Sequence, residues 1–599
     1  MPSAKSKNGI TLLLDKNAFA KLSYYGQWEE IIRTVQLEGN LEAIPVMVIH
    51  LIWSAIQFGI FWNITKYCGG DDLQQFSIQH WNLIVKNLIL YCFITATLAI
   101  NGMYQGPLLG EPFFRLTALR FMPGTIKEPF FSFFGNRRTV LDVVLYISTI
   151  GTAVWVMITP NPTKLQVRGY LAVVGLQWAT DYACWVGSDG MFHGVLAFAL
   201  CSMYGGLTFD GTLNRTMDDY RGGVAAMQLF LGYLYFGCGM GKMGIWFSRV
   251  FAQEWTTPPW AVGNIFLRNL FYKDVEGKDY NPTKFAIIFS YVAASCEWTP
   301  PLLFLLTDDV FHFGNTPTYI GLLILEAMHL YIIFHLPLAD VNYLNILPGI
   351  LLYYSFVVYP NANGNSIGYD LEGIKSMNVY IGSIMTFFAC YCVYGHLNTD
   401  KVTYTCAWRF WAGNWPQGYY LITTAGMAKL VDGKNLVKIG KPWLDNLHPN
   451  ALPTKQHCVV QAYRILGASW LAQLCGRVLP KTIELAIKLG GGKERKLSDY
   501  DYVMHCMGLN QFVGGVMGNC SLRSKFTIKR LQEACKFKRG ELLYVHVDSF
   551  APMLYSNKTT WEVHDAKDGL LAAGTTTTDE CIALKNPTLC KHLNFGKEE

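Results

Sequence analysis

The stretch GYLYFGCGMGKMGIW, residues 232–246, lies in a run that is otherwise apolar from Val224 to Phe247. A run of about 20 apolar residues is long enough to cross the hydrocarbon core of a bilayer as a helix. Lys242 is the single charged residue of this run. The stretch therefore predicts a membrane span with a lysine about one turn before its end.

The composition of the whole chain agrees with a protein that crosses a membrane several times. Of its 599 residues, 51% are hydrophobic and only 15% are charged. This balance is typical of polytopic membrane proteins. The net charge of +6 is modest for this length, so no nucleic-acid partner is expected. The 16 cysteines form no CxxC pair and no Cys/His cluster with zinc spacing, so no metal site is expected.

Apolar stretches of sufficient length recur along the first two thirds of the chain, and we expect about ten spans. They fall near residues 43–64, 82–101, 140–159, 169–187, 191–209, 224–246, 285–307, 318–337, 344–360 and 378–396. The predicted fold class is therefore mainly α, a polytopic helical membrane bundle with a small soluble α+β domain after it.

Three domains follow from this pattern: an N-terminal amphipathic segment over 1–42, a transmembrane helical domain over 43–396, and a basic C-terminal domain over 397–599. The N-terminal segment, the 102–139 and 247–284 connections and the C-terminal domain carry most of the Lys and Arg residues. We therefore expect both termini on the cytoplasmic (or matrix or stromal) side, in a membrane that the sequence does not identify.

The C-terminal domain shows two alternating patterns typical of strands. They are GELLYVHVDSF (540–550) and TTWEVHDAKDGLLAAGT (559–575), and the second contains the turn pair Asp568-Gly569. Before them, residues 462–489 have helical apolar spacing that is interrupted by Pro480. This predicts two helices followed by a β-rich unit.

Lys242 has two readings, because an ionisable residue at membrane depth marks either a structural pair or a functional site. Gly237 and Gly241 form a small-xxx-small pair that lets another helix approach closely. In the structural reading, Lys242 reaches the interface or pairs with a carboxylate. In the functional reading, it is a desolvated amine that acts as a base.

Further ionisable residues occur in the later spans. Glu297 precedes Pro300-Pro301, which we expect to break or kink the seventh span, and it is a candidate counter-ion for Lys242. Glu326 and His329 are three residues apart and share a helix face. This pair could be a proton relay, a metal half-site or a packed hydrogen-bonded pair. No phosphate-binding loop, nucleophile elbow or HExxH motif accompanies these residues.

Several segments in order resemble an uncharacterised multi-pass transmembrane family, a domain of unknown function common in actinobacteria. The resemblance covers about residues 100–575, and its family has no assigned activity. The segments are GPLLGEPFFRL (106–116), MPGTIKEPFF (122–131), NRRTVLDVVLY (136–146), HLYIIFHLPLADVNYLNI (329–346), WRFWAGNWPQGYY (408–420) and LQEACKFKRGE (531–541).

A shorter segment, YFGCGMGKMGIW (235–246), resembles the vitamin K-dependent γ-carboxylase-like (HTTM) membrane proteins. The resemblance implies that Lys242 is a base toward a quinol cofactor, and Glu297 and His329 follow in a compatible order as catalytic candidates. Glu326, Asn342 and Asp181 are the candidate groups for binding a cofactor or substrate, and the cofactor stays unidentified.

Three functional hypotheses remain open at this point. The first is a membrane-embedded enzyme that acts on a lipidic substrate, such as a quinone or isoprenoid, with Lys242 as base. The second is a non-catalytic accessory or assembly subunit of a larger membrane complex, bioenergetic for instance. The third is a transporter, for which kinked spans with buried charges are compatible but no inverted repeat is visible. In every case membrane lipids are expected partners.

Overall fold

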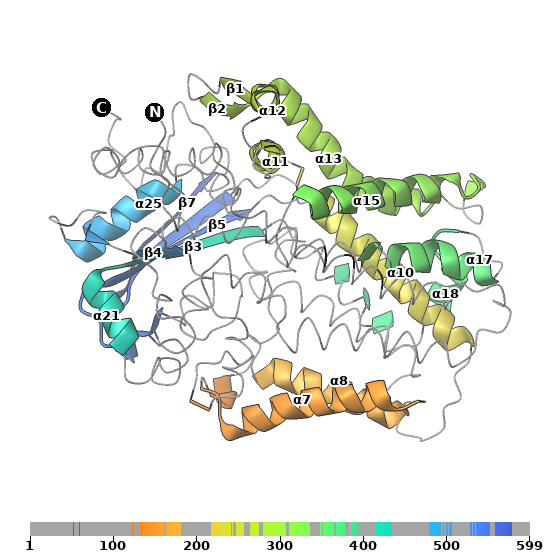
Figure 1. Ribbon diagram of the computed structural model, residues 1–599, viewed down its shortest axis with the longest axis horizontal. Coiled ribbons are helices and arrows are strands. Elements are labelled where there is room, and N and C mark those ends of the chain that lie inside the picture. The colour runs from red at the N-terminus through yellow and green to blue at the C-terminus, as the bar shows by residue number, and fades with distance from the viewer. Residues whose placement is uncertain are drawn as a thin grey trace.

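The computed structural model describes about half of the chain. With short internal gaps, the described residues are 132–180, 217–306, 311–335, 348–377, 414–432, 478–505, 528–550 and 558–577, together with isolated positions near 52–59, 123–129 and 382–393. Figure 1 shows a β-sheet with its helices at one end of the molecule and the long helices at the other.

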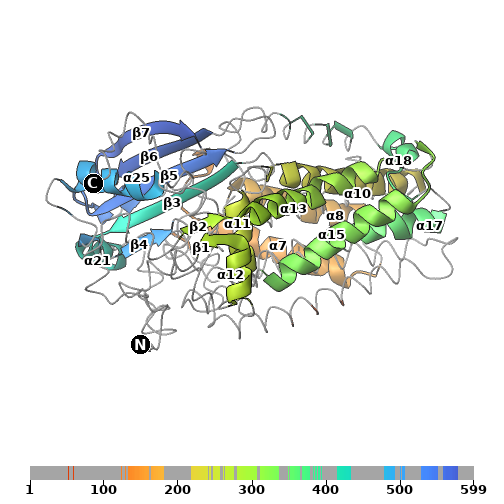
Figure 2. The same ribbon diagram turned by 90° about the horizontal axis from the view of Figure 1, so that it is seen from above.

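Among the described residues, five long helices occupy the region expected to span the membrane. They are α7 (Val140–Ile158), α8 (Lys164–Thr180), α10 (Met217–Met240), α13 (Lys284–Leu303) and α15 (Thr316–His335). Helix α7 packs on α8, while α13 packs on both α10 and α15 (Figures 1 and 2). The α10–α13–α15 group therefore forms the framework on which the polar groups of the bundle are placed.

Local signals explain where several helices begin. Thr139 precedes α7, and its side chain and that of Asp142 form a reciprocal capping box. Thr283 caps α13 in a similar way by accepting a hydrogen bond from the Ala286 amide. Asp142 lies within an expected span, and its carboxylate serves this cap.

Three of the described helices are long and apolar enough to cross a membrane: Val140–Ile158, Arg221–Met240 and Thr316–Ile333. They coincide with three of the ten expected spans. Helices α8 and α13 lie at two more of the expected positions, and residues 351–363 are helical at another. The expected spans 43–64, 82–101, 191–209 and 378–396 lie outside the described residues apart from isolated positions.

The structure corrects the expected end of the sixth span. Helix α10 ends at Met240, and Lys242 lies in the turn that follows it, so the lysine is beyond the helix rather than inside it. In α13, Pro300 and Pro301 lie in the last turn before the end at Leu303. They mark the end of that helix rather than a kink in its middle.

Two short helices and a small hairpin follow α10. They are α11 (Phe247–Thr256), α12 (Ile265–Phe271), β1 (Tyr272–Asp274) and its antiparallel partner β2 (Asp279–Pro282). Their axes differ from those of the long helices: α11 and α12 are seen nearly end-on in Figure 1, where α10, α13 and α15 run across the view. This unit therefore forms a layer at one end of the long helices.

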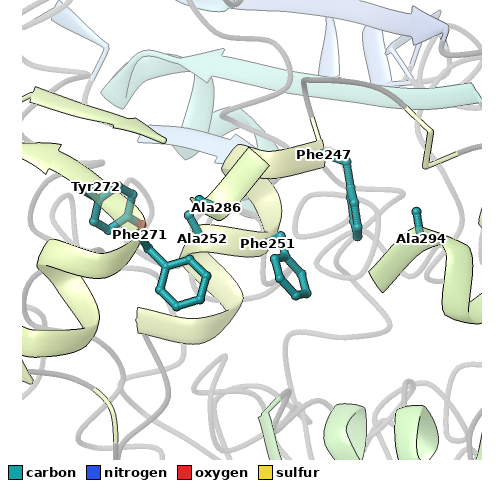
Figure 3. Close-up of a cluster of buried hydrophobic side chains, with 7 residues drawn as sticks. All are labelled: Phe247, Phe251, Ala252, Phe271, Tyr272, Ala286 and Ala294. Carbon is teal, nitrogen blue, oxygen red and sulfur yellow. The ribbon is translucent and has the colours of Figure 1, made fainter. Parts of the chain in front are cut away.

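An aromatic core attaches this unit to the bundle (Figure 3). Phe251 contacts Phe289 of α13, with ring centroids 5.2 Å apart, and Trp255 stacks on Tyr331 of α15 at 5.0 Å. The fully buried residues of this cluster are Phe247, Phe251, Ala252, Phe271, Tyr272, Ala286 and Ala294. Burial of large aromatic rings is a strong source of packing energy, so this core fixes the chain leaving α10 against α13 and α15.

The opposite half of α10 is held by a second set of contacts, from the segment that includes the π-helix η6 (Tyr354–Val358), α17 (Tyr359–Asn363) and α18 (Leu371–Lys375). Arg221 makes a bidentate pair with Asp370, at 2.7 and 2.8 Å, and Asp370 also caps α18. Buried Gln228 donates to the backbone oxygens of Ser355 and Gly368. The side chains of Arg221, Gln228 and Asp370 thus form hydrogen bonds with one another's segments. We interpret these contacts as structural, because they hold this segment against α10.

The C-terminal region contains a five-stranded antiparallel sheet of order β4-β3-β5-β6-β7. Its strands are β3 (Asn414–Ile422), β4 (Tyr502–His505), β5 (Leu542–Phe550), β6 (Lys558–Asp565) and β7 (Gly569–Thr577). Helix α25 (Val478–Ala486), continued by the π-helix η7 (Ile487–Gly491), packs on β5 and β6, and α21 (Thr424–Asp432) follows β3. The α+β composition and the two predicted strand regions are confirmed for the described residues.

The β6–β7 hairpin shows why its sequence turns where it does. Asp565 accepts hydrogen bonds from the Lys567 and Asp568 amides, at 2.8 and 3.0 Å, and Gly569 has a φ of 81°. Only glycine adopts this backbone region at no steric cost. The expected turn at Asp568-Gly569 is therefore present.

Candidate functional site

The polar groups of the bundle lie along the carboxyl half of α10 and in the turn that follows it. Tyr235 lies two turns before Lys242, and α13 and α15 provide the facing residues. The surrounding helices are apolar, so each polar group here needs a partner or leaves a buried polar atom unpaired.

Lys242 and Glu297 form an ion pair in which the lysine Nζ donates to the glutamate Oε1. The Glu297 side chain is 8% exposed and that of Lys242 is 20% exposed. The backbone N–H of Lys242 donates to the Gly239 carbonyl oxygen at 3.0 Å. The Lys242 Nζ atom lies 5.9 Å from the centroid of the Phe247 ring. The Glu297 carboxylate is thus buried, and the Lys242 side chain is mostly enclosed.

A glycine allows this pair to form. A side-chain carbon at Gly239 would lie 2.6 Å from the Trp298 amide nitrogen and 2.9 Å from the Ala294 carbonyl oxygen. The backbones of α10 and α13 are therefore in contact at this residue, which lies between the two glycines of the expected Gly237–Gly241 pair. Since Glu297 is adjacent to Trp298, this close approach brings its carboxylate to Lys242.

A second polar group lies between α10 and α15. The Tyr235 hydroxyl and the His329 Nε2 are 2.6 Å apart, and both residues are buried. On the other side of the imidazole, His329 Nδ1 is 3.6 Å from Glu326 Oε2, which is beyond hydrogen-bond distance. Among the described residues, neither His329 Nδ1 nor Glu326 Oε1 has a hydrogen-bond partner, although both atoms are buried.

Gly349 lies against the same pair. A side-chain carbon at this position would be 2.8 Å from Glu326 Oε2 and 3.0 Å from His329 Nδ1. A larger residue would therefore displace the carboxylate or the imidazole. The expected shared face of Glu326 and His329 is confirmed, and a third chain segment encloses it.

The structure thus brings together four of the six predicted site residues, as the pairs Lys242–Glu297 and Glu326–His329. Asp181 and Asn342 lie outside the described residues. Within the described parts of the chain, no group of three or more His, Cys, Asp or Glu side chains has an arrangement that could hold a metal ion.

Sequence reasoning missed Tyr235, because a tyrosine in an apolar span carries no charge and does not stand out. In an uninterrupted helix, its seven-residue separation from Lys242 would place the two on one side, about 10 Å apart along the axis, although α10 itself ends at Met240. That spacing was the available signal, and it becomes informative only once His329 is known to face Tyr235.

A family model described as a transmembrane protein of unknown function (DUF3556) matches residues 44–591. No curated protein and no solved structure matches the chain.

Proposed function

Because this chain belongs to the family of transmembrane proteins of unknown function DUF3556, its own residues must indicate an activity, and we propose a membrane-embedded enzyme that transfers protons to or from a lipidic substrate. The observation that supports this proposal is the Lys242–Glu297 pair, enclosed at the junction of α10, α11 and α13.

The pair can provide both an acid and a base. Burial of two charges carries a desolvation cost, and transfer of one proton from Lys242 Nζ to the Glu297 carboxylate would leave a neutral amine beside a carboxylic acid. The neutral amine of Lys242 then accepts a proton from the substrate, while the Glu297 carboxyl holds the other proton. A quinone or isoprenoid-like molecule requires mostly apolar surroundings, and the apolar helices around the pair would supply them.

The test is native mass spectrometry of the protein extracted into nanodiscs from its own membrane. We expect the wild type to retain a stoichiometric apolar ligand and Lys242→Met to lose it. Lys375→Met is the matched control, because Lys375 also pairs with a glutamate, Glu372, but both side chains are exposed. The control should keep the ligand.

A second step separates an enzyme from the alternatives. Incubation of the wild type with the recovered ligand in deuterated water should raise the mass of that ligand by exchange of C–H for C–D, and Lys242→Met should not raise it. A wild type that retains protein subunits but no small molecule would instead support the accessory-subunit hypothesis. With the protein reconstituted into vesicles, a ligand that crosses the vesicle membrane chemically unchanged would support the transporter hypothesis.

A further inference from the structure

The short helix α12 leaves two large apolar side chains uncovered at one end of the bundle. Ile265 is 53% exposed and Phe266 is 70% exposed. On its inner side, α12 packs Leu267 and Leu270 against the aromatic core. Its outer side combines the two exposed apolar residues with exposed Asn269, a mixture that suits the boundary between lipid acyl chains and headgroups.

The end of α12 is fixed at the beginning of α13. The Thr283 hydroxyl donates to the Leu270 carbonyl oxygen at 2.6 Å, and the Thr283 amide donates to the Phe271 carbonyl oxygen at 3.0 Å. The Phe271 ring also contacts that of Phe285, with centroids 5.7 Å apart. The carboxyl end of α12 therefore lies level with the first turn of α13.

The direction of α12 differs from that of the long helices. In Figure 1, α12 is seen nearly end-on, whereas α13 runs across the view. Helix α13 packs on α10 and α15, which are both long and apolar enough to cross a membrane. Since spanning helices run at a modest tilt from the bilayer normal, α12 lies near the membrane plane, at the depth where α13 begins.

The outer side of α13 indicates which medium surrounds it. Phe285, Ile288 and Val292 are exposed large apolar residues at helical spacing, while Ser290 and Glu297 are among the buried residues of this helix. Apolar residues outside and polar residues inside suit a helix that faces lipid. Phe285 is the first of these exposed residues, so the lipid-facing surface of α13 begins at the level of α12.

Two exposed cations border this surface. Lys284 directly precedes Phe285, and Lys273 follows the end of α12 by two residues in strand β1. Both side chains are exposed, so each ammonium can extend along the apolar surface to the headgroup layer. Positive groups at this depth attract anionic lipids.

We propose that α12 is an interfacial helix, whose Ile265 and Phe266 insert among the acyl chains while Lys273 and Lys284 bind the headgroup phosphates of anionic lipids. The bilayer is the occupant of this surface, because the surface continues into the lipid-facing side of α13 and is bordered by cations. The proposal goes beyond the proposed function and does not depend on it, since an enzyme, an accessory subunit and a transporter could each carry such an anchor.

The experiment is photo-crosslinking of the full chain in nanodiscs made of equal parts phosphatidylcholine and phosphatidylglycerol. The variant Phe266→p-benzoylphenylalanine is irradiated, and mass spectrometry detects the captured molecule. Benzophenone forms a C–C bond at a nearby C–H group, so an adduct carries the whole mass of one lipid. We expect a lipid adduct at residue 266, which fragmentation assigns to an acyl chain.

Two further positions calibrate this result. The same photo-reactive group in place of Ile288, on the outer side of α13, should also capture lipid. In place of Leu570, which is 57% exposed in the C-terminal sheet, it should capture little or none. Hydrogen exchange over α13 reports whether each variant is folded.

The contribution of the lysines is measured by the ratio of the two lipids captured at residue 266. We expect several times more phosphatidylglycerol than phosphatidylcholine. Lys273→Gln combined with Lys284→Gln should bring the ratio close to one. Lys375→Gln is the matched control, because Lys375 is also an exposed lysine, and it should leave the ratio unchanged.

Three results would overturn the interfacial helix: no lipid adduct at residue 266, an adduct there no more abundant than at residue 570, or capture of a second copy of the chain in place of lipid. A lipid ratio of one with both lysines present would overturn their role in binding headgroups. None of these results bears on the proposed function, which is tested by ligand retention in Lys242→Met.

Discussion

Lys242 and Glu297 are 55 residues apart in the chain, yet they form an ion pair at the point where the backbones of α10 and α13 touch. The Lys242 side chain is 20% exposed and that of Glu297 is 8% exposed, so each charge is largely removed from solvent and faces the other. The pair therefore couples the end of α10 to α13.

The first prediction concerns this coupling. Lys242→Met leaves the Glu297 carboxylate buried and uncompensated, so it should lower the free energy of unfolding by about 3–5 kcal/mol. The double variant Lys242→Met with Glu297→Leu removes both charges and should recover most of this loss. Denaturant unfolding in nanodiscs measures both, and Lys375→Met on the exposed pair should stay within about 0.5 kcal/mol of the wild type. A double variant as unstable as the single one would contradict the coupling.

The second prediction concerns the helix contact at Gly239. Gly239→Ala places a methyl group 2.6 Å from the Trp298 amide nitrogen and should separate α10 from α13, at a cost of about 1–3 kcal/mol. Gly151→Ala in α7 is the control, because no atom lies within 4 Å of its added carbon. Thermal unfolding should show a lower midpoint for Gly239→Ala only; equal midpoints would argue against contact at this glycine.

The third prediction concerns the aromatic core of Figure 3. Phe251 is 3% exposed and contacts rings from α11, α12 and α13, so Phe251→Ala should cost about 3–5 kcal/mol through the cavity it leaves. Phe133→Ala is the control, since Phe133 is 76% exposed. Hydrogen–deuterium exchange should show lost protection over residues 247–274 in Phe251→Ala, and unchanged protection there would show that the core is not needed to hold this unit.

The fourth prediction is a pH dependence in the C-terminal region. Burial raises the pKa of the Glu541 carboxyl, but hydrogen bonds from Lys429 Nζ at 2.5 Å and the Lys538 amide at 2.6 Å outweigh it, and the net pKa lies below the ordinary 4.5. A lowered pKa means that the stabilisation is present above the ordinary carboxyl value and is lost as the pH falls through the folded-state value.

We therefore expect Glu541→Gln to weaken the α21–β5 junction by about 1.5–3 kcal/mol at neutral pH. The difference from the wild type should vanish in acid, below the folded-state pKa of Glu541. Hydrogen exchange of the Thr423 amide, which donates to the Glu541 carbonyl, reports on this junction. A difference that persists undiminished in acid would show that the carboxylate charge is not its source.

The sequence alone determined the elements whose signals are local. The apolar runs at 140–159 and 318–337 predicted α7 and α15, because a run of that length can satisfy its backbone in a bilayer only as a helix. The alternating pattern and Asp568-Gly569 predicted the β6–β7 hairpin, because strand alternation and turn geometry are properties of neighbouring residues. The shared face of Glu326 and His329 followed in the same way from helical spacing.

Only the tertiary structure decided which of these elements face one another. Spacing along a helix assigns a residue to a face but does not say which helix packs there, so the Lys242–Glu297 pair was a hypothesis. The Tyr235–His329 contact and the Arg221–Asp370 pair, 149 residues apart, had no local signal at all. The end of α10 at Met240 was also visible only in the structure, where α11 follows and packs its Phe247 and Phe251 into the aromatic core.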